Sequence, residues 1–336
     1  MLYNIHDIIS KFFKEQKTYI QIVEKQLSIS QRGNFSAIAI NDQYFQLVPC
    51  PEFFQNIYRG QTKYYNPCKS SIYRDNNSFF HRFIERIRNV EFELLIKSHP
   101  ILLEVQKMRI DNKQLLIDYK ALAQHYGLKT ELLDFTSDIP IAVFFACCDY
   151  DKKTDEYIPI TSSDSGGVFY QYNYLIEKII PQTNRTSNVV GLQPLPRPGE
   201  QSAFSVLLKK NDCLNKNRFV RIHSFKHDKD ISNSIFEYFE GGNKIFPKTP
   251  VDDKIKILLK TKEFSIEAFE IAFLRFVGNR NKYSALKDRI ISNGFSLVND
   301  RAVNFTESEI KEICNNWMNT RDNFYSRIQW RQTYCG

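Results

Sequence analysis

The stretch that decides the fold covers residues 121–149 and reads ALAQHYGLKTELLDFTSDIPIAVFFACCD. Its first part concentrates polar side chains that can do chemistry, namely Gln124, His125, Tyr126, Thr130, Asp134, Thr136 and Ser137. An apolar run over 139–148 follows and is interrupted only by Pro140. The run fits a buried helix or a strand, and Pro140 near its start favours a helix, because proline is tolerated in the first helical turn. The sequence therefore predicts reactive groups at the rim of a rigid core element.

Length and composition indicate an ordinary globular protein. The 336 residues are 42% hydrophobic and 25% charged, which suits one large or two modest domains. Phenylalanine and tyrosine are frequent, at 27 and 18 residues, and we expect aromatic-rich cores. The formal net charge of +8 permits an anionic partner such as a nucleotide or nucleic acid. The basic residues are scattered among acidic ones, so no nucleic-acid-binding tail is expected.

Cysteine and histidine spacing gives no sign of a metal site. The seven cysteines form no CxxC pair, and the six histidines form no HExxH or Cys/His zinc pattern, so we expect no structural metal. An odd number of cysteines is typical of a reducing cytosol. Charges from Asp7 onward interrupt the N-terminus too early for a signal peptide, and no uncharged run reaches the roughly 18 residues of a membrane helix. We expect a soluble, cytoplasmic protein with no membrane partner.

Upstream of residue 121 the pattern predicts helices and short strands. An amphipathic helix is predicted over 4–28, and strands over 36–40, 44–48 and 53–60. Residues 61–78 have the composition of a loop. Helices are predicted over 79–97 with Ser78 as N-cap, over 101–109, and over 118–126 with Gly127 as C-cap.

Downstream, the pattern predicts mainly loops and helices. We expect a polar loop over 150–166, a strand over 167–172, a Pro/Gly-rich connection over 181–203 and a strand over 204–208. Residues 212–250 are predicted to be rich in loops. Helices are predicted over 251–262, 266–276, 284–293 and 307–317, the last with Thr306 as N-cap.

Arg59 stands at the end of the predicted strand over 53–60. Its guanidinium is either solvated at the strand terminus or aimed into a cleft, where it would hold a phosphate or carboxylate through two hydrogen bonds.

These motifs resemble the FRG domain, a family named after an aromatic-Arg-Gly motif. Here that motif is Tyr58-Arg59-Gly60, followed by Gln61 as is common in the family. The strongest similarity lies over 121–146, with the Gln-His-aromatic-Gly segment at 124–127, the Thr-x-Leu-Leu-Asp-aromatic-Thr segment at 130–136 and an apolar A-x-x-F-A run. The resemblance covers residues 50–210 and extends at most to 275.

Two positions depart from the family pattern. Ser202 replaces the usual glycine of a late Q-G-x-F segment, and Lys129 stands where the family commonly has a proline. Both changes affect the expected loop geometry more than the identity of the domain. A weaker similarity, which includes Arg74, follows the first motif.

The motif order is similar to that of the ADP-ribosyltransferase class, whose enzymes use an Arg or His on an early strand, a Ser or Thr on a middle strand and a Glu or Gln on a late strand. The matching positions are Arg59, then Thr136 or Ser137, then Glu200 or Gln201.

The resemblance implies an α+β fold with a mixed or antiparallel split β-sheet core, flanking helices and an ADP-ribosyltransferase-like layout. The expected organisation is an N-terminal helix and hairpin over 1–49, the FRG domain over 50–276 with its core over 50–210, and a helical C-terminal extension over 277–336.

With NAD as substrate, the resemblance assigns a role to each group. Arg59, supported by Arg74, would bind the pyrophosphate, and Thr136 or Ser137 would orient the ribose. Glu200 or Gln201 would stabilise the positive charge that develops on that ribose. The remaining predicted NAD-binding residues are Gln61, Gln124, Tyr126 and Asp134.

Two further side chains keep two interpretations each. His125 is either a catalytic acid or base, because its ordinary pKa lies near neutrality, or a helix-capping residue. Asp134 either fixes His125 or Arg59 through a charged hydrogen bond or caps the segment that begins at Ile139.

Three hypotheses follow. The leading one is an NAD-dependent mono-ADP-ribosyltransferase, such as a bacterial toxin or an anti-phage defence effector, with a protein or nucleic acid as acceptor. The alternative is a non-enzymatic nucleotide- or nucleic-acid-binding module that stacks bases on aromatic rings. The third is a hydrolase with a His125–Asp134 dyad and Ser137 or water as nucleophile, which lacks a G-x-S-x-G nucleophile turn.

Overall fold

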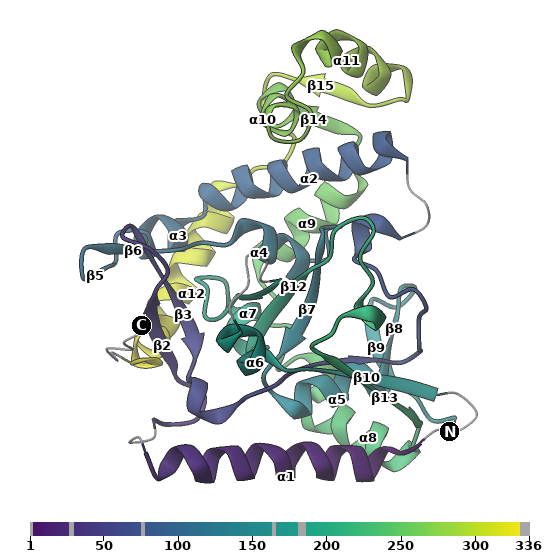
Figure 1. Cartoon of the computed structure of the whole chain (residues 1–336). Helices are drawn as coiled ribbons and strands as arrows, with labels where there is room; N and C mark the ends of the chain where they lie inside the picture. Colours follow the sequence, from purple (N-terminus) through teal and green to yellow (C-terminus); the bar gives the residue numbers. More distant parts are fainter. Residues whose placement is uncertain (1–2, 27–29, 75–77, 163–165, 181–185, 330–336) are drawn as a thin grey trace. The chain divides into compact units, whose positions relative to one another are not determined.

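The computed structural model describes residues 3–26, 30–74, 78–162, 166–180 and 186–329. This part of the chain forms the α+β protein that the sequence predicted (Figure 1). It divides into two compact units, each built from separate segments of the chain. Unit 1 comprises Met1–Lys69, Leu133–Pro247 and Ser326–Gly336, and unit 2 comprises Ser70–Leu132 and Lys248–Tyr325. The ranges predicted from the sequence divide the chain differently and stay a prediction.

Unit 1 is organised around a mixed β-sheet. Its strands β1 and β13 pair in parallel, whereas β13 with β10, β10 with β4, β4 with β7 and β11 with β12 pair antiparallel. In spatial order the described strands are β1 (Tyr3–Asn4), β13 (Val220–Lys226), β10 (Gly166–Tyr172), β4 (Ile57–Gln61), β7 (Leu132–Thr136), β12 (Ala203–Leu207) and β11 (Ser187–Val189). The expected mixed sheet is therefore present.

Smaller elements complete unit 1. Strands β2 (Phe35–Ala39) and β3 (Tyr44–Pro49) pair antiparallel, β16 (Ile328–Gln329) joins β2 in parallel, and β8 (Cys148–Asp151) pairs with β9 (Glu156–Pro159). The α-helices of the unit are α1 (Ile5–Glu24), α5 (Ile139–Cys147), α6 (Tyr174–Ile179), α7 (Pro196–Glu200) and α8 (Lys229–Tyr238). Single 3₁₀ turns are η1 (Pro51–Phe53), η3 (Leu214–Lys216) and η4 (Glu240–Gly242).

The apolar run after Thr136 forms helix α5, so the helix that Pro140 favoured is confirmed. Asp138 is its N-cap, since its carboxylate accepts a hydrogen bond from the backbone N–H of Ile141 at 3.2 Å. Gly60 lets α5 lie directly on strand β4. A Cβ at Gly60 would stand 1.9 Å from the carbonyl oxygen of Ala142, a contact that no side chain tolerates.

The two faces of the sheet bury different cores. On the α5 face, Tyr58 packs with the apolar side of α1, where Ile5, Ile8 and Phe12 are buried as predicted. The opposite face carries Ile57, Leu133, Phe135, Tyr170, Tyr172, Phe204 and Val206. Because side chains alternate along a strand, Tyr58 and Gly60 face α5 while Arg59 and Gln61 face the second core.

Unit 2 is mostly helical. Helix α10 lies along α2, and their contact buries Phe83, Phe269 and Phe273. Its described α-helices are α2 (Phe79–Lys97), α3 (Pro100–Val105), α4 (Tyr119–His125), α9 (Pro250–Lys260), α10 (Ile266–Phe276), α11 (Tyr283–Ser292) and α12 (Glu307–Ser326). Its described strands are β5 (Arg109–Ile110), β6 (Lys113–Leu115), β14 (Glu263–Ser265) and β15 (Ser296–Val298), with 3₁₀ turns η2 (Ser71–Tyr73) and η5 (Arg280–Lys282).

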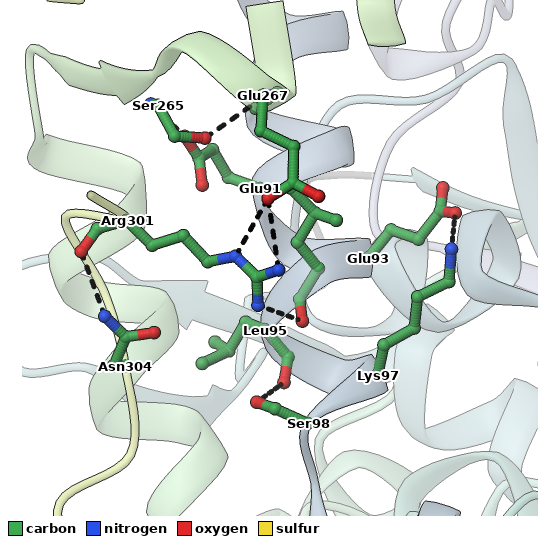
Figure 2. A network of polar contacts seen from close by, with 11 residues as sticks. Glu91, Glu93, Leu95, Lys97, Ser98, Ser265, Glu267, Arg301 and Asn304 are labelled. Carbon is green, nitrogen blue, oxygen red and sulfur yellow. Dashed lines mark hydrogen bonds and ion pairs between the residues drawn. The ribbon is translucent and has the colours of Figure 1, made fainter. Parts of the chain in front are cut away.

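A polar network fixes the start of α10 on α2 (Figure 2). The buried carboxylate of Glu91 accepts a hydrogen bond from the backbone N–H of Ser265, the N-cap of α10. Arg301 donates to the Leu94 carbonyl at 3.1 Å and to Glu267 at 3.1 Å. Burial is the main cause that raises the pKa of Glu91, and nearby Arg301 acts in the opposite direction. Polar contacts therefore join the start of α10 to α2 next to the apolar contact between the two helices.

Several predicted segments differ from the structure. The connection predicted over 181–203 contains β11 and α7, and the strand predicted over 53–60 begins only at Ile57. The polar loop over 150–166 holds most of the β8–β9 hairpin, and the loop-rich segment over 212–250 contains β13 and α8. The helix predicted over 101–109 ends at Val105, and the one over 307–317 continues to Ser326. β13 pairs with β10 along all its seven residues, so its hydrogen-bonding partner and not its own apolar content makes it a strand.

In the part of the chain that the structure describes, no helix is both long and apolar enough to cross a membrane.

Candidate functional site

Arg59 lies on β4 at the centre of the unit 1 sheet. Its Nη1 donates a hydrogen bond to the backbone carbonyl of Asp134 on the neighbouring strand β7, at 2.8 Å. The side chain is half-buried, and its buried Nε has no hydrogen-bond partner among the described residues. Because Tyr58 pairs with Thr136 in the antiparallel β4–β7 ladder, a guanidinium that reaches Asp134 lies over β7 and away from its end at Thr136. Both interpretations of Arg59 stay predictions.

Thr136 joins the end of β7 to the segment that enters β12. Its hydroxyl donates to the backbone carbonyl of Gln201 at 2.7 Å and accepts from the backbone N–H of Asp138 at 2.9 Å. The N–H of Ser137 donates to the carbonyl of Ser202 at 3.2 Å. Both side chains are buried, with 4% and 7% of their surface exposed. The predicted middle and late segments thus meet through direct hydrogen bonds.

The two late candidates, which stand next to each other at the end of α7, have different surroundings. Gln201 is buried and its side-chain amide donates to the carbonyl of Ile245 at 3.0 Å. Glu200 is exposed, and its carboxylate forms an ion pair with Arg327 at 2.9 Å. Of the two, Glu200 carries the carboxylate that solvent and a ligand can reach.

Ser202, the residue that departs from the family pattern, has a backbone φ of 43°. This is the left-handed region, where a Cβ is crowded by the following carbonyl and glycine is favoured. The position therefore has the geometry of a glycine although it holds a serine. The departure costs local strain, while the carbonyl of Ser202 still reaches Ser137.

Gln61 and Tyr170 extend the surroundings of Arg59. Tyr170 stands directly opposite Arg59 in the β10–β4 ladder, so both side chains lie on the same face. Burial raises the pKa of the Tyr170 phenol, and the Arg59 guanidinium acts in the opposite direction. The thiol of Cys68 donates to the Gln61 side chain at 3.7 Å. A polar patch therefore surrounds Arg59 on the otherwise apolar second face.

The remaining predicted residues fall in unit 2. Gln124 is half-buried and accepts a hydrogen bond from the hydroxyl of Thr130 at 2.6 Å. Tyr126 is buried and packs on Phe92, with ring centroids 5.9 Å apart. Arg74 is exposed at the end of η2. These contacts hold unit 2 together and leave the predicted NAD-binding roles of the three residues as predictions.

His125 is buried at the end of α4, where Gly127 has the positive φ of 85° expected of a C-cap. Within its unit, the acidic neighbour of His125 is Asp118, the N-cap of α4. Burial raises the pKa of Asp118, and His125 acts in the opposite direction. Asp134 belongs to unit 1, so the His125–Asp134 dyad stays a prediction. The N-cap of α5 is Asp138, so Asp134 does not fill the capping role considered for it.

Sequence reasoning missed a cationic and aromatic cluster beside Asp134. The guanidinium of Arg197 on α7 lies 5.4 Å from the ring centre of Phe246, which stacks on Tyr157 at 5.1 Å. Burial raises the pKa of Tyr157; Arg197 lowers it and Asp134 raises it further, so both charges lie near this phenol. Arg197 stands between Pro196 and Pro198. Its charge within a long Pro-rich segment is the signal in the sequence that could have indicated a functional role.

Chemically, the end of the unit 1 sheet combines cations, hydroxyls and an accessible carboxylate. Arg59 donates a hydrogen bond to the backbone oxygen of Asp134, and both Arg197 and Asp134 act on the phenol of Tyr157. Two arginines in this position suit an anionic ligand such as a phosphate ester. Within the described segments, no group of three or more His, Cys, Asp or Glu side chains is arranged to hold a metal ion.

The fold and the site define an α+β protein with a mixed sheet whose central strands carry the polar residues. Residues 55–155 match the family model of the FRG domain, so the chain contains an FRG domain, as its motifs predicted. The matched range includes the Tyr58-Arg59-Gly60 motif and the whole of helix α5. Searches of curated proteins and of solved structures gave no match.

Proposed function

We propose that the end of the β4–β7–β12 sheet is an NAD-binding site of the ADP-ribosyltransferase type. One observation carries the proposal: β4 bears the early residue and its neighbour β7 bears the middle one, while the late residues at the end of α7 come directly before β12, the next strand of the sheet. Arg59 and Thr136 also connect them directly, through the carbonyls of Asp134 and Gln201. Residues that are more than a hundred positions apart in the sequence therefore belong to neighbouring segments of unit 1.

The contacts suggest a role for each group. Arg59 binds the pyrophosphate, because a guanidinium forms two charged hydrogen bonds with phosphate oxygens. Thr136 acts by fixing the turn between the strands, since its hydroxyl is already bonded on both sides. Glu200 stabilises the charge that develops on the ribose. The buried Gln201 holds the neighbouring Glu200 in position. The exposure of the Glu200 carboxylate supports Glu200 as the proposed late residue.

In the reaction proposed, the bond between C1′ of the ribose and the nicotinamide nitrogen breaks. Nicotinamide leaves with the electron pair, and a nucleophilic atom of the acceptor bonds to C1′ and loses its proton. The acceptor is a macromolecule, either a protein or a nucleic acid. Modification of a host macromolecule would make the protein a toxin or a defence effector.

Release of nicotinamide from NAD tests the proposal. The wild-type chain should release it, and Arg59→Ala and Glu200→Gln should each lower the rate by about 10-fold or more, because each removes a charge that contacts the ligand. Arg221→Ala is the matched control, since Arg221 is an exposed arginine on β13 of the same unit. Nicotinamide release that is equal in Arg59→Ala and wild type would contradict the proposal.

The non-enzymatic alternative makes a different prediction for the same preparations. A nucleic-acid-binding module would bind RNA or DNA with an affinity that falls steeply as salt rises, because phosphate contacts release counterions. Such binding without any nicotinamide release would favour the alternative.

A further inference from the structure

The C-terminal segment of unit 1 reaches the candidate site through Arg327. Its guanidinium lies 2.9 Å from the carboxylate of Glu200, and its Nη2 donates to the carbonyl of Gly199 at 3.5 Å. On the other side, its Nε donates to the carbonyl of Gly33 at 3.3 Å, and the cation stands 5.1 Å from the ring centre of Phe35. One side chain therefore connects α7 with the start of β2.

The backbone of the same residue anchors the segment. The carbonyl of Arg327 accepts a hydrogen bond from the backbone N–H of Phe35 at 2.7 Å, and Ile328 pairs with Phe35 in the parallel β16–β2 ladder. The side chain of Arg327 is 22% exposed, so its contacts are shielded from water more than those of an ordinary surface pair. The guanidinium is thus held in place from two sides.

The segment that Arg327 holds is also one that needs support. Directly after α7, Ser202 adopts the left-handed φ of 43° although it carries a Cβ. The carbonyls of Gln201 and Ser202 are the acceptors that fix Thr136 and Ser137. Relaxation of the strained residue would withdraw both acceptors from the end of β7.

We infer that Arg327 is a positioning residue of the candidate site: it clamps α7 so that Glu200 faces the ligand and the strained turn at Ser202 stays in register with β7. The identity of the ligand rests on the proposed function. The support that Arg327 gives to the turn at Ser202 does not depend on it. Arg327 therefore belongs to the functional part of the protein.

Arg327→Met tests this, because methionine keeps the apolar contact with Phe35 and removes every hydrogen bond of the guanidinium. The amides of residues 199–207 should lose hydrogen-exchange protection, and the affinity for NAD should fall by roughly tenfold as Glu200 loses its fixed position. Arg321→Met is the matched control, since Arg321 also pairs with a glutamate, Glu104, but in unit 2. Arg327→Lys is measured alongside, in case the methionine variant does not fold.

Ser202→Gly in the Arg327→Met background separates positioning from general stability. Glycine takes up a positive φ without a Cβ penalty, so it should restore most of the lost NAD affinity and exchange protection. Unchanged exchange at residues 199–207 in both Arg327 variants would overturn the inference, whatever the affinity. Increased exchange there in a protein that binds no NAD would support the clamp and contradict the proposed function, so the two failures are distinguishable.

Discussion

The two halves of the central motif fold into different surroundings. In the first half, Gln124 bonds Thr130 and His125 closes helix α4, both inside unit 2. In the second half, Asp134 receives Arg59 and Thr136 bonds Gln201, all inside unit 1. The polar residues of one continuous stretch therefore have two different roles. Some end helix α4, and the others connect neighbouring strands. Adjacency in sequence is consequently a poor guide to which of these residues act together.

Gly127 in the first half and Gly60, the β4 residue on which helix α5 of the second half packs, should differ most in their response to substitution. Gly60→Ala should cost about 3 kcal/mol or more in unfolding free energy, because the new Cβ meets the backbone of α5 and neither element can move away. Gly127→Ala should cost about 1 kcal/mol, because the φ of 85° is strained for alanine but nothing stands within 4 Å of the new Cβ. Urea denaturation of both variants measures the difference. Equal losses would contradict the close packing of β4 on α5.

The threonines of the two halves should agree in stability and differ in ligand binding. Thr136→Val and Thr130→Val should each cost about 2 kcal/mol, since each leaves a buried backbone N–H without its acceptor. For Thr136 that N–H belongs to Asp138, and for Thr130 it belongs to Leu132. Only Thr136→Val should also weaken NAD binding. A loss of affinity of the same size in both variants would remove the distinction drawn between the halves.

Asp118 gives a pH-dependent test within the first half. Burial raises its folded-state pKa above the usual 3.8, so its contribution to stability is present below that value and is lost as pH rises through the folded-state pKa. Asp118→Asn keeps an N-cap acceptor for Ala121 and cannot ionise, so it should be at least as stable as wild type at neutral pH. Asp118→Ala should be less stable than Asp118→Asn by about 1 kcal/mol. Thermal denaturation from pH 3 to pH 8 measures the difference in stability between the wild type and Asp118→Asn. A wild type that becomes more stable relative to Asp118→Asn as pH rises would contradict the raised pKa of Asp118.

The smallest expected effect concerns Ser202. Ser202→Gly removes the strain of the left-handed φ but increases the conformational entropy of the unfolded chain. Because the two effects oppose each other, the unfolding free energy should change by less than about 1 kcal/mol. Glycine at 202 should leave NAD affinity unchanged in the otherwise wild-type protein, because Arg327 already holds the turn. A large loss of stability would show that the serine side chain has a role beyond the backbone.

Local signals predicted much of the fold. Ser78 caps α2 as predicted, and Pro140 lies in the first turn of α5. β13 and the β8–β9 hairpin were missed because each is made by pairing with a partner strand, and their residues alternate only weakly between apolar and polar. Elements that depend on a partner far away in sequence leave little trace in their own composition.

The candidate site was predictable in part. The motif identified Arg59 and Thr136, and the structure brings their strands together. Arg197, Tyr170 and Arg327 were missed, since their relevance comes from ladder register and from contacts with residues far away in the sequence. The sequence also did not show that Gln201 is buried while Glu200 is exposed.

Calorimetric titration of NAD into the wild-type, Arg59→Ala and Arg221→Ala proteins tests whether Arg59 binds NAD. We expect binding to the wild-type chain, unchanged binding to Arg221→Ala, and an affinity for Arg59→Ala that is about 10-fold to 100-fold weaker, because a charged hydrogen-bond donor to phosphate is lost. Absence of wild-type binding at millimolar NAD, or equal affinities of the Arg59→Ala and wild-type proteins, would contradict this expectation.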